Sequence, residues 1–177
     1  TDYFQQKNVI PKFYFIVDRI DLADQAKTEF TNRGLIPKVI SSRIDFINDL
    51  KKVGALSNHS GRNEITIVNI QKFSENSIIN EMNDYDIHVQ RIYFIDEAHR
   101  SYNPKGLSLA NLYNSDPKAI KIALTGTPLL KEVAKEYDTK ALFGKYIHKY
   151  YYNQSIADGY TLRLIREDIE TTYKMQM

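Results

Sequence analysis

Cysteine is absent from this sequence of 177 residues, and so is tryptophan. Without cysteine the chain can form neither a disulfide nor a thiolate metal site, which agrees with a cytoplasmic setting. No apolar run approaches the roughly 20 residues needed to span a bilayer, and no signal peptide opens the chain. We therefore expect no membrane association.

A strong excess of charge is also lacking. Lys and Arg number 24 and Asp and Glu number 22, so the net charge is 24 − 22 = +2. This balance is too weak to indicate nucleic-acid binding on its own, and any basic groove must come from local clustering. The length and the apolar content of 42% are sufficient for one domain with a full core.

Glycine is scarce, at seven residues, and the phosphate-binding pattern GxxxxGK[ST] does not occur. The one Gly-Lys pair, Gly144-Lys145, lacks the preceding glycine at the required spacing. Nor is there a convincing Asp…Glu-x-Lys nuclease set. We therefore expect this chain alone to bind ATP poorly and neither to hydrolyse ATP nor to cut DNA. The histidines show no ligand spacing, so a metal site built from them alone is not expected (His59, His88, His99 and His148).

Strand-like and helix-like segments alternate along the first two thirds of the chain. This order predicts a three-layer α/β domain with a mainly parallel sheet. The predicted strands are 12–17, 38–40, 65–70, 91–95 and 119–124, the predicted helices are 21–32, 42–50, 77–84 and 105–113, and residues 53–63 are predicted to be a loop. Asp21 is the expected cap of its helix, and Gly34 lies just past the end of that helix.

The last third has a different character. Residues 146–152 are aromatic enough to predict a strand, residues 154–157 a short helix that stops at Gly159, and residues 162–169 an exposed or edge strand. For Tyr150-Tyr151-Tyr152 we favour alternate packing into a core over a second interpretation, a platform on which bases stack. Because a buried-type strand begins soon after Thr1 and the chain ends in a polar stretch, we expect a fragment of a longer protein.

The most informative stretch is the apolar run Ile92-Tyr93-Phe94-Ile95, which leads directly into Asp96-Glu97-Ala98-His99. A continuous apolar run indicates a strand buried on both faces, and ligands of such sheets bind beyond the carboxyl ends of the strands. One carboxylate can hold a hydrated magnesium ion and the next can orient or deprotonate an attacking water. This is the layout of a Walker B motif, although acids also cap helix N-termini for structural reasons.

A second polar corner follows the next predicted strand. Thr125-Gly126-Thr127-Pro128 places two hydroxyl groups and a compact backbone at the carboxyl end of that strand. The alternative is a simple turn, since Gly and Pro mark turns in any case. Its position one strand downstream of Asp-Glu-Ala-His favours a functional interpretation.

Together these residues resemble the first motor domain of superfamily 2 helicases and translocases, and within it the restriction subunit of type I restriction-modification enzymes. The resemblance spans nearly the whole chain, and its segments occur in the family's order. They are Ile16–Leu22 with Gln25, Ile67–Phe73, Phe94–Ser101, Ala123–Leu129, and the tail segments Phe143–Tyr146 and Ile156–Leu162. The implied fold is a RecA-like domain that lacks its Walker A strand and loop. Residues 1–145 would be the partial first motor domain, and residues 146–177 the exit segment toward a second one.

The resemblance also implies roles for individual residues. Asp96 would bind Mg²⁺ through water, and Glu97 would position or activate the hydrolytic water. His99 would couple the nucleotide site to the second motor domain or to the following motif. The corner Thr125, Gly126 and Thr127 would link the ATP state to DNA engagement. Four residues would lie on the DNA-facing side, namely Arg19, Asn69, Gln71 and Lys72; Asn69 stands where relatives carry Thr. Cations at strand-end loops can neutralise phosphates, and we favour this role for Arg19 and Lys72 over the alternative of solvated surface charges.

The implied function is ATP-driven translocation on double-stranded DNA, coupled to cleavage by a type I site-specific deoxyribonuclease. Its cofactors would be ATP and Mg²⁺, and its partners double-stranded DNA and the methylase and specificity subunits. Three alternatives remain open: another superfamily 2 enzyme such as a type III restriction subunit or repair helicase, a non-enzymatic nucleic-acid-binding module, and an unrelated magnesium enzyme that uses Asp96 and Glu97 alone.

Overall fold

The computed structural model describes residues 2–51, 63–70, 88–99, 116–128 and 143–163. The chain divides into two compact units, residues 1–144 and 145–177, which are described separately. The predicted helices 77–84 and 105–113, and nearly all of the predicted loop 53–63, lie outside the described residues.

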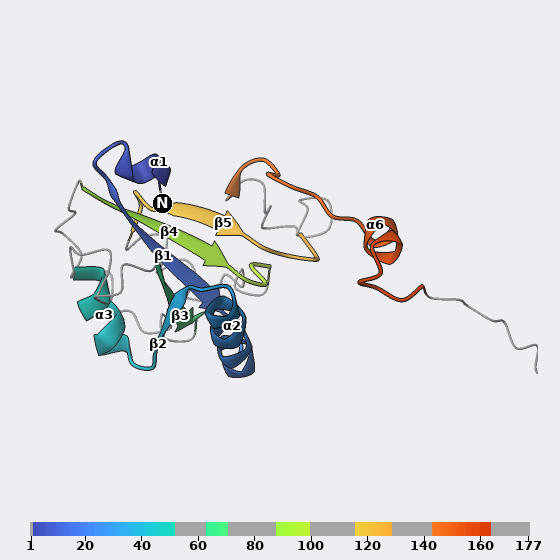
Figure 1. The fold of residues 1–177 in the computed structure, drawn as a ribbon, viewed down its shortest axis with the longest axis horizontal. Coiled ribbons are helices and arrows are strands. Elements are labelled where there is room, and N and C mark those ends of the chain that lie inside the picture. The colour runs from blue at the N-terminus through green and yellow to red at the C-terminus, as the bar shows by residue number, and fades with distance from the viewer. Residues whose placement is uncertain (1, 52–62, 71–87, 100–115, 129–142, 164–177) are drawn as a thin grey trace, which may run out of the picture. The chain divides into compact units, whose positions relative to one another are not determined.

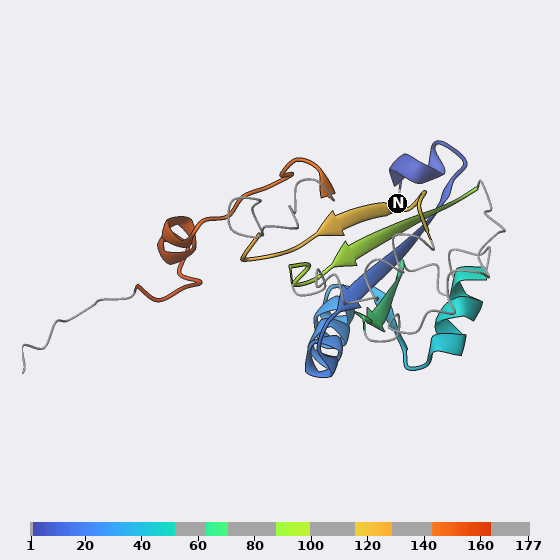
Figure 2. The ribbon, with the colours of Figure 1, turned by 180° about the vertical axis from the view of Figure 1, so that it is seen from behind.

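The first unit is built on five strands that pair in parallel in the order β2-β3-β1-β4-β5. Figure 1 shows them side by side, and Figure 2 shows the same sheet from behind. The strands are β1 (Ile10–Val17), β2 (Ile36–Ile40), β3 (Glu64–Asn69), β4 (Val89–Ile95) and β5 (Ile120–Ala123). The five strands predicted for this part of the chain and their parallel pairing are confirmed, with ends that differ by one or two residues.

Helices α2 (Ile20–Asn32) and α3 (Arg43–Lys51) cover opposite faces of this sheet. Successive side chains of β1 point to opposite faces, so Phe15 and Val17 pack with α2 while Tyr14 and Ile16 lie in the cluster that contains Phe46 of α3. The predicted three-layer α/β architecture is therefore confirmed.

Two local details of the helices differ from expectation. Arg19 is the N-cap of α2 and makes no side-chain cap hydrogen bond, so the predicted cap at Asp21 is wrong: Asp21 lies inside the first turn and pairs with Arg19. Gly34 does follow the helix end, with φ of +81°, a left-handed conformation that glycine adopts without steric cost. A short helix, α1 (Asp2–Gln5), precedes β1 and was not predicted.

Two registered rows of side chains cross all five strands on the face covered by α3. The row nearer the carboxyl ends is apolar, and most of it belongs to the main core cluster (Ile40, Val68, Ile16, Ile95 and Ala123). The preceding row is polar or amphipathic (Lys38, Thr66, Tyr14, Tyr93 and Lys121). Burial of the second row requires hydrogen-bond partners, because an unpaired polar group in the interior costs free energy.

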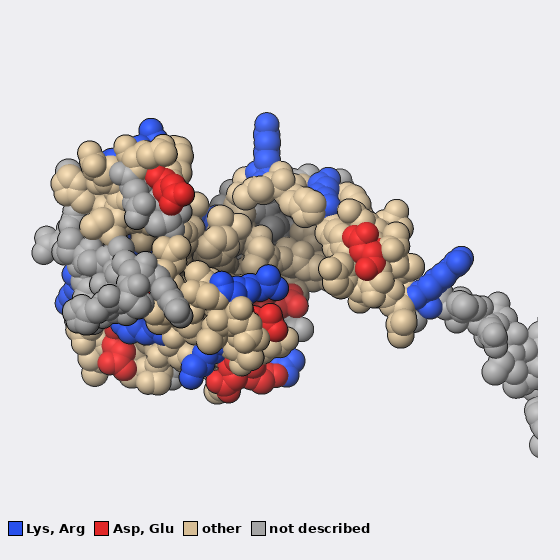
Figure 3. All heavy atoms as spheres, viewed as in Figure 1, with Lys and Arg blue, Asp and Glu red and all other residues tan. Residues whose placement is uncertain are grey.

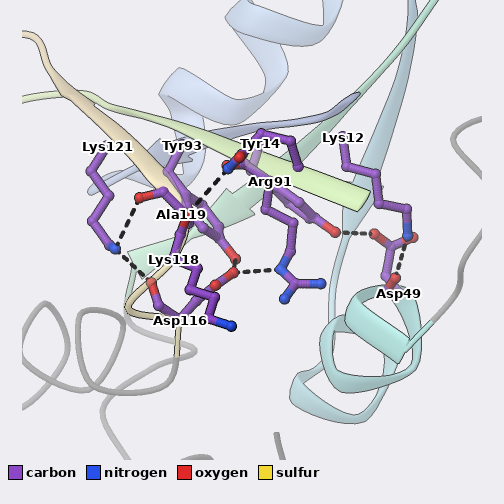
Figure 4. A network of polar contacts seen from close by, with 10 residues as sticks. Lys12, Tyr14, Asp49, Arg91, Tyr93, Asp116, Lys118, Ala119 and Lys121 are labelled. Atoms are coloured by element: carbon purple, nitrogen blue, oxygen red, sulfur yellow. Dashed lines mark hydrogen bonds and ion pairs between the residues drawn. The ribbon is translucent and has the colours of Figure 1, made fainter. Parts of the chain in front are cut away.

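Asp116, just before β5, supplies one set of these partners (Figure 4). Its carboxylate pairs with the guanidinium of Arg91 and accepts a hydrogen bond of 3.0 Å from the Tyr93 hydroxyl. The Lys121 ammonium donates to the main-chain oxygen of Asp116 at 2.6 Å. Asp116 is only 1% exposed, so β4 supplies two partners for a buried carboxylate, while β5 supplies one for its main-chain oxygen.

Asp49 of α3 supplies the second set. The Tyr14 hydroxyl donates to its carboxylate at 3.0 Å, Lys38 forms an ion pair with it, and Lys12 donates to its main-chain oxygen at 2.6 Å. Tyr14 and Tyr93 are stacked with ring centroids 5.0 Å apart, which joins the two carboxylate clusters through an aromatic pair. The pKa of both phenols is raised well above the ordinary value, mainly because the rings are buried. The negative charge of Asp49 adds to the effect for Tyr14, and that of Asp116 for Tyr93. Both hydroxyls therefore remain hydrogen-bond donors.

The second unit contains the helix α6 (Tyr152–Ala157), which ends before Gly159, as predicted. The predicted strand 146–152 is wrong: residues 146–151 form no strand and Tyr152 begins α6. Aromatic content favours a strand only where a neighbouring strand completes the hydrogen bonds, and the described residues of this unit provide none. Leu162 and Arg163 are not in a strand, and the rest of the predicted strand 162–169 lies outside the described residues. Among the described helices, none is long and apolar enough to cross a membrane.

The Asp116 cluster leads to a prediction about stability. Replacing Asp116 by Ala leaves the buried Arg91 guanidinium without this partner and should lower the free energy of unfolding by about 3–5 kcal/mol. Asp21→Ala is the matched control, because it removes an aspartate from an exposed ion pair and should cost less than about 1 kcal/mol. Urea denaturation of the chain and both variants measures the difference, and equal effects would contradict a structural role for the Asp116 cluster.

Candidate active site

The segments that follow β4 and β5 meet at the carboxyl edge of the sheet. The Leu124 amide donates to the Ile95 carbonyl at 2.9 Å, and the Ala98 amide donates back to the Leu124 carbonyl at 3.2 Å. Asp96 and Glu97 therefore lie beside Thr125, the first residue of the threonine-rich corner. Ala98 is fully buried, which anchors the acidic turn in the core.

His99 links the two segments through a single ring nitrogen. Its Nδ1 lies 2.7 Å from the Thr125 hydroxyl oxygen and 3.1 Å from a carboxylate oxygen of Glu97. An ionised carboxylate only accepts hydrogen bonds, so the position of Glu97 favours the tautomer that carries its proton on Nδ1. Nδ1 thus lies between Glu97 and Thr125, and the three side chains form one line of polar contacts across the two strand ends.

The threonine corner is a compact turn held by its own side chain. The Thr125 hydroxyl oxygen accepts a hydrogen bond of 3.1 Å from the Thr127 amide, as in the turns that Ser and Thr commonly form. Gly126 and Thr127 are exposed. A Cβ placed on Gly126 would meet nothing within 4 Å, so packing among the described residues does not explain the glycine.

The backbone of Glu97 adopts a left-handed conformation, with φ of +46°. For a residue with a Cβ this costs about 1–2 kcal/mol, and such residues cluster at functional sites, where the surrounding structure holds them. Here the buried Ala98, its hydrogen bond to Leu124 and the contact with His99 hold Glu97 in this conformation. The direction of the Glu97 carboxylate is thus set by the joined ends of β4 and β5.

The ends of β1 and β3 continue the same edge. The Asp96 amide donates to the Ile16 carbonyl of β1 at 2.9 Å, and the Asn69 side-chain amide of β3 donates to the Asp18 carbonyl at 3.3 Å. Asp18 was not among the predicted site residues. A signal was present, since the apolar run of β1 leads into Asp18 as that of β4 leads into Asp96.

The donor set at this edge suits magnesium bound together with a phosphate. Among the described residues, no group of three or more His, Asp or Glu side chains could hold a metal ion by itself. Magnesium at nucleotide sites needs only one or two carboxylates, and completes its shell with phosphate oxygens and water. Asp96 and Glu97, both partly exposed, fit that requirement.

The residues predicted to face DNA are only partly described. Arg19 is the N-cap of α2 and donates two hydrogen bonds to the Asp21 carboxylate, one of 3.2 Å from Nε and one of 2.7 Å from a terminal guanidinium nitrogen. The two side chains are 60% and 63% exposed. Asn69 is largely buried at the end of β3, where its amide holds the Asp18 corner. Gln71 and Lys72 lie outside the described residues.

A family model described as SWI2/SNF2 ATPase matches residues 1–176. The chain belongs to the SWI2/SNF2 ATPase family. The five-stranded parallel sheet, with helices on both faces, is the RecA-like α/β fold expected for this family. The motif-based resemblance to type I restriction subunits is also confirmed by two relatives.

The first relative is "Type I restriction enzyme HindI endonuclease subunit" of Haemophilus influenzae, 28% identical over 174 residues, which cover 89% of this chain and 15% of the relative. The second is "Putative type I restriction enzyme MjaVIIIP endonuclease subunit" of Methanocaldococcus jannaschii, 28% identical over 175 residues, which cover 92% of this chain and 17% of the relative. The chain thus spans about a sixth of the length of these relatives.

The position of Glu97 predicts a proton on Nδ1 of His99 in this SWI2/SNF2 family member, and nuclear magnetic resonance can test that prediction. In the ¹⁵N-labelled chain, at a pH where the imidazole is neutral, long-range ¹H–¹⁵N spectra should show the His99 tautomer with the proton on Nδ1. Thr125→Val removes one acceptor and should shift the Nδ1 resonance, whereas Thr125→Ser keeps the hydroxyl and should not. A proton on Nε2 of His99 would contradict the predicted tautomer; the resonances of His88 provide the internal control.

Proposed function

We propose that this chain is part of the ATP-driven motor of a type I restriction endonuclease subunit, whose parent couples ATP hydrolysis to translocation on double-stranded DNA and to DNA cleavage. The observation that carries the proposal is the link between the acidic end of β4 and the threonine corner of β5 through His99. The names of the two relatives support the type I assignment, and the family supports nucleotide binding.

In this proposal Glu97 acts on the attacking water. Its carboxylate would orient the water and accept its proton, while the contact with His99 Nδ1 and the left-handed backbone would hold the carboxylate in one direction. Asp96 would hold Mg²⁺ through water, and bound Mg²⁺ supplies neutralisation of phosphate charge. The glycine-rich phosphate loop does not occur in these 177 residues, so tight ATP binding requires sequence that this chain does not contain.

Coupling between the nucleotide and DNA would pass through the threonine corner. Thr125 contacts His99 directly, whereas Gly126 and Thr127 are exposed beyond it. A change at Glu97 that alters the His99 hydrogen bond therefore reaches the exposed part of the corner through one side chain. We assign the coupling role to Thr125, Gly126 and Thr127 on this basis.

DNA contact would use the corner after β1. Arg19 would bind backbone phosphates there, and Asn69 would hold the corner through the Asp18 carbonyl. Gln71 and Lys72 follow β3 in sequence and would extend the same surface. The complete parent would act in the cytoplasm with methylase and specificity subunits, as a type I site-specific deoxyribonuclease.

The water-activating role predicts the effect of one isosteric change. In the intact parent, Glu97→Gln should lower ATP turnover by at least about 100-fold, because the amide cannot accept the proton, while ATP binding is retained. Glu29→Gln, which removes an exposed carboxylate of α2, is the matched control and should leave turnover unchanged. Steady-state hydrolysis and equilibrium nucleotide binding separate the two effects; turnover near the wild-type rate in Glu97→Gln would show that the assigned role is wrong.

The Arg19–Asp21 ion pair predicts opposite effects of two substitutions on duplex DNA. In the parent, Arg19→Ala should weaken binding equally for all sequences and reduce the salt slope by about 0.9, the value for one lost phosphate contact. Asp21→Asn releases the guanidinium from its carboxylate and should strengthen binding. Titrations of duplex DNA at several salt concentrations measure both. If neither variant changes the affinity, Arg19 is a solvated surface charge.

A further inference from the structure

The second unit carries aromatic side chains that the proposed motor chemistry does not use. Among the described residues of this unit, five tyrosines are exposed (Tyr146, Tyr150, Tyr151, Tyr152 and Tyr160). Tyr151 is 61% and Tyr160 81% exposed. The favoured prediction that Tyr150-Tyr151-Tyr152 packs alternately into a core is therefore wrong, and α6 has no buried residue at all.

Two of the five rings are held in place by hydrogen bonds of their hydroxyl groups. The Tyr150 hydroxyl donates to the Asp158 carboxylate at 2.7 Å, and the Tyr152 hydroxyl donates to the Leu162 carbonyl at 3.0 Å. The hydroxyls of Ser155 and Thr161 also share a hydrogen bond, so the residues after α6 fold back onto it. Rings whose positions are fixed before binding lose less conformational entropy when a ligand docks.

Positive charge accompanies the tyrosines. The described residues 145–163 contain Lys145, Lys149 and Arg163 against Asp158, a net charge of 3 − 1 = +2 in addition to His148. The Lys149 ammonium lies 4.7 Å from the centroid of the Tyr146 ring. Figure 3 shows cationic side chains projecting from this unit.

The combination discriminates between two kinds of partner. Protein–protein interfaces are enriched in tyrosine but depleted in lysine, whereas sites for single-stranded nucleic acid combine stacking aromatic rings with cations that follow the phosphates. Two exposed aliphatic residues, Ile147 and Leu162, would suit a protein partner. The five exposed tyrosines and the cations between them favour single-stranded nucleic acid over a protein partner.

We propose that residues 146–160 form a stacking surface for single-stranded nucleic acid, with Tyr151 and Tyr160 as the principal stacking residues and Lys149 on the phosphates. This goes beyond the proposed function, which places duplex DNA on the first unit at Arg19. Stacking is tolerant of sequence, because every base has an aromatic face, so the surface should bind single strands without strong sequence preference.

The test uses the whole 177-residue chain and three fluorescein-labelled probes of 20 positions: oligo(dT), the same backbone without bases, and a duplex that contains the dT strand. Fluorescence polarisation should show tighter binding to oligo(dT) than to the other two probes. Tyr151→Ala and Tyr160→Ala should each weaken oligo(dT) binding by about fivefold or more, whereas Tyr151→Phe should retain it. Lys149→Gln should reduce the salt slope by about 0.7.

Tyr3→Ala is the matched control, because Tyr3 is 64% exposed in the first unit and also lies near a lysine. It should leave oligo(dT) binding unchanged. No binding to oligo(dT), equal binding to the abasic backbone, or equal losses in Tyr3→Ala and Tyr151→Ala would each overturn the proposal. Failure here would leave the Glu97 and Arg19 experiments on the parent unaffected, so the two proposals are tested separately.

Discussion

The in-register parallel pairing of β4 with β1 on one side and β5 on the other determines where every candidate catalytic group lies. Because Ile16, Ile95 and Ala123 share one row, the residues that follow them emerge together at the carboxyl edge. Shifting either pairing by one residue would send the alternating side chains of β4 to the other face of the sheet. It would also separate His99 from Thr125. The positions of the candidate catalytic side chains therefore depend first on strand register.

The polar row farther from the carboxyl ends of the same strands explains why only one register is stable. Apolar rows can slide against one another with modest loss, but the row that holds Tyr14 and Tyr93 must meet fixed carboxylates. A displaced strand would leave Asp116 buried with its hydrogen bonds unmade, at a cost of several kcal/mol. Asp49 adds the same constraint from α3. We interpret the Asp116 and Asp49 clusters as the interactions that fix strand register. The candidate site, at the carboxyl ends of the strands, depends on that register.

Much of this could be read from the sequence, for identifiable reasons. Toward their carboxyl ends β1, β3 and β4 consist of apolar runs, residues 13–17, 67–68 and 92–95, and strands buried on both faces leave that signature. The sequence places the acidic corner and the threonine corner at the same edge, because both follow strands of a parallel sheet. Arg91 gave no such signal: the buried cation is paired with Asp116, which is 25 residues away in sequence. The left-handed backbone of Glu97 was equally invisible, since it depends on the link between Ala98 and Leu124. The aromatic run 146–152 failed as a strand because composition does not reveal whether a neighbouring strand exists.

The conformation of Glu97 has a mechanical consequence. A residue held at positive φ relaxes to ordinary backbone as soon as its restraints are removed, and the side chain swings with the peptide plane. Here three restraints act together: the burial of Ala98, its hydrogen bond to the Leu124 carbonyl, and the contact of Glu97 with His99. In the proposed function, an event that separates the ends of β4 and β5 would therefore turn the Glu97 carboxylate away without contacting it, and an event that brings these ends together would restore its direction.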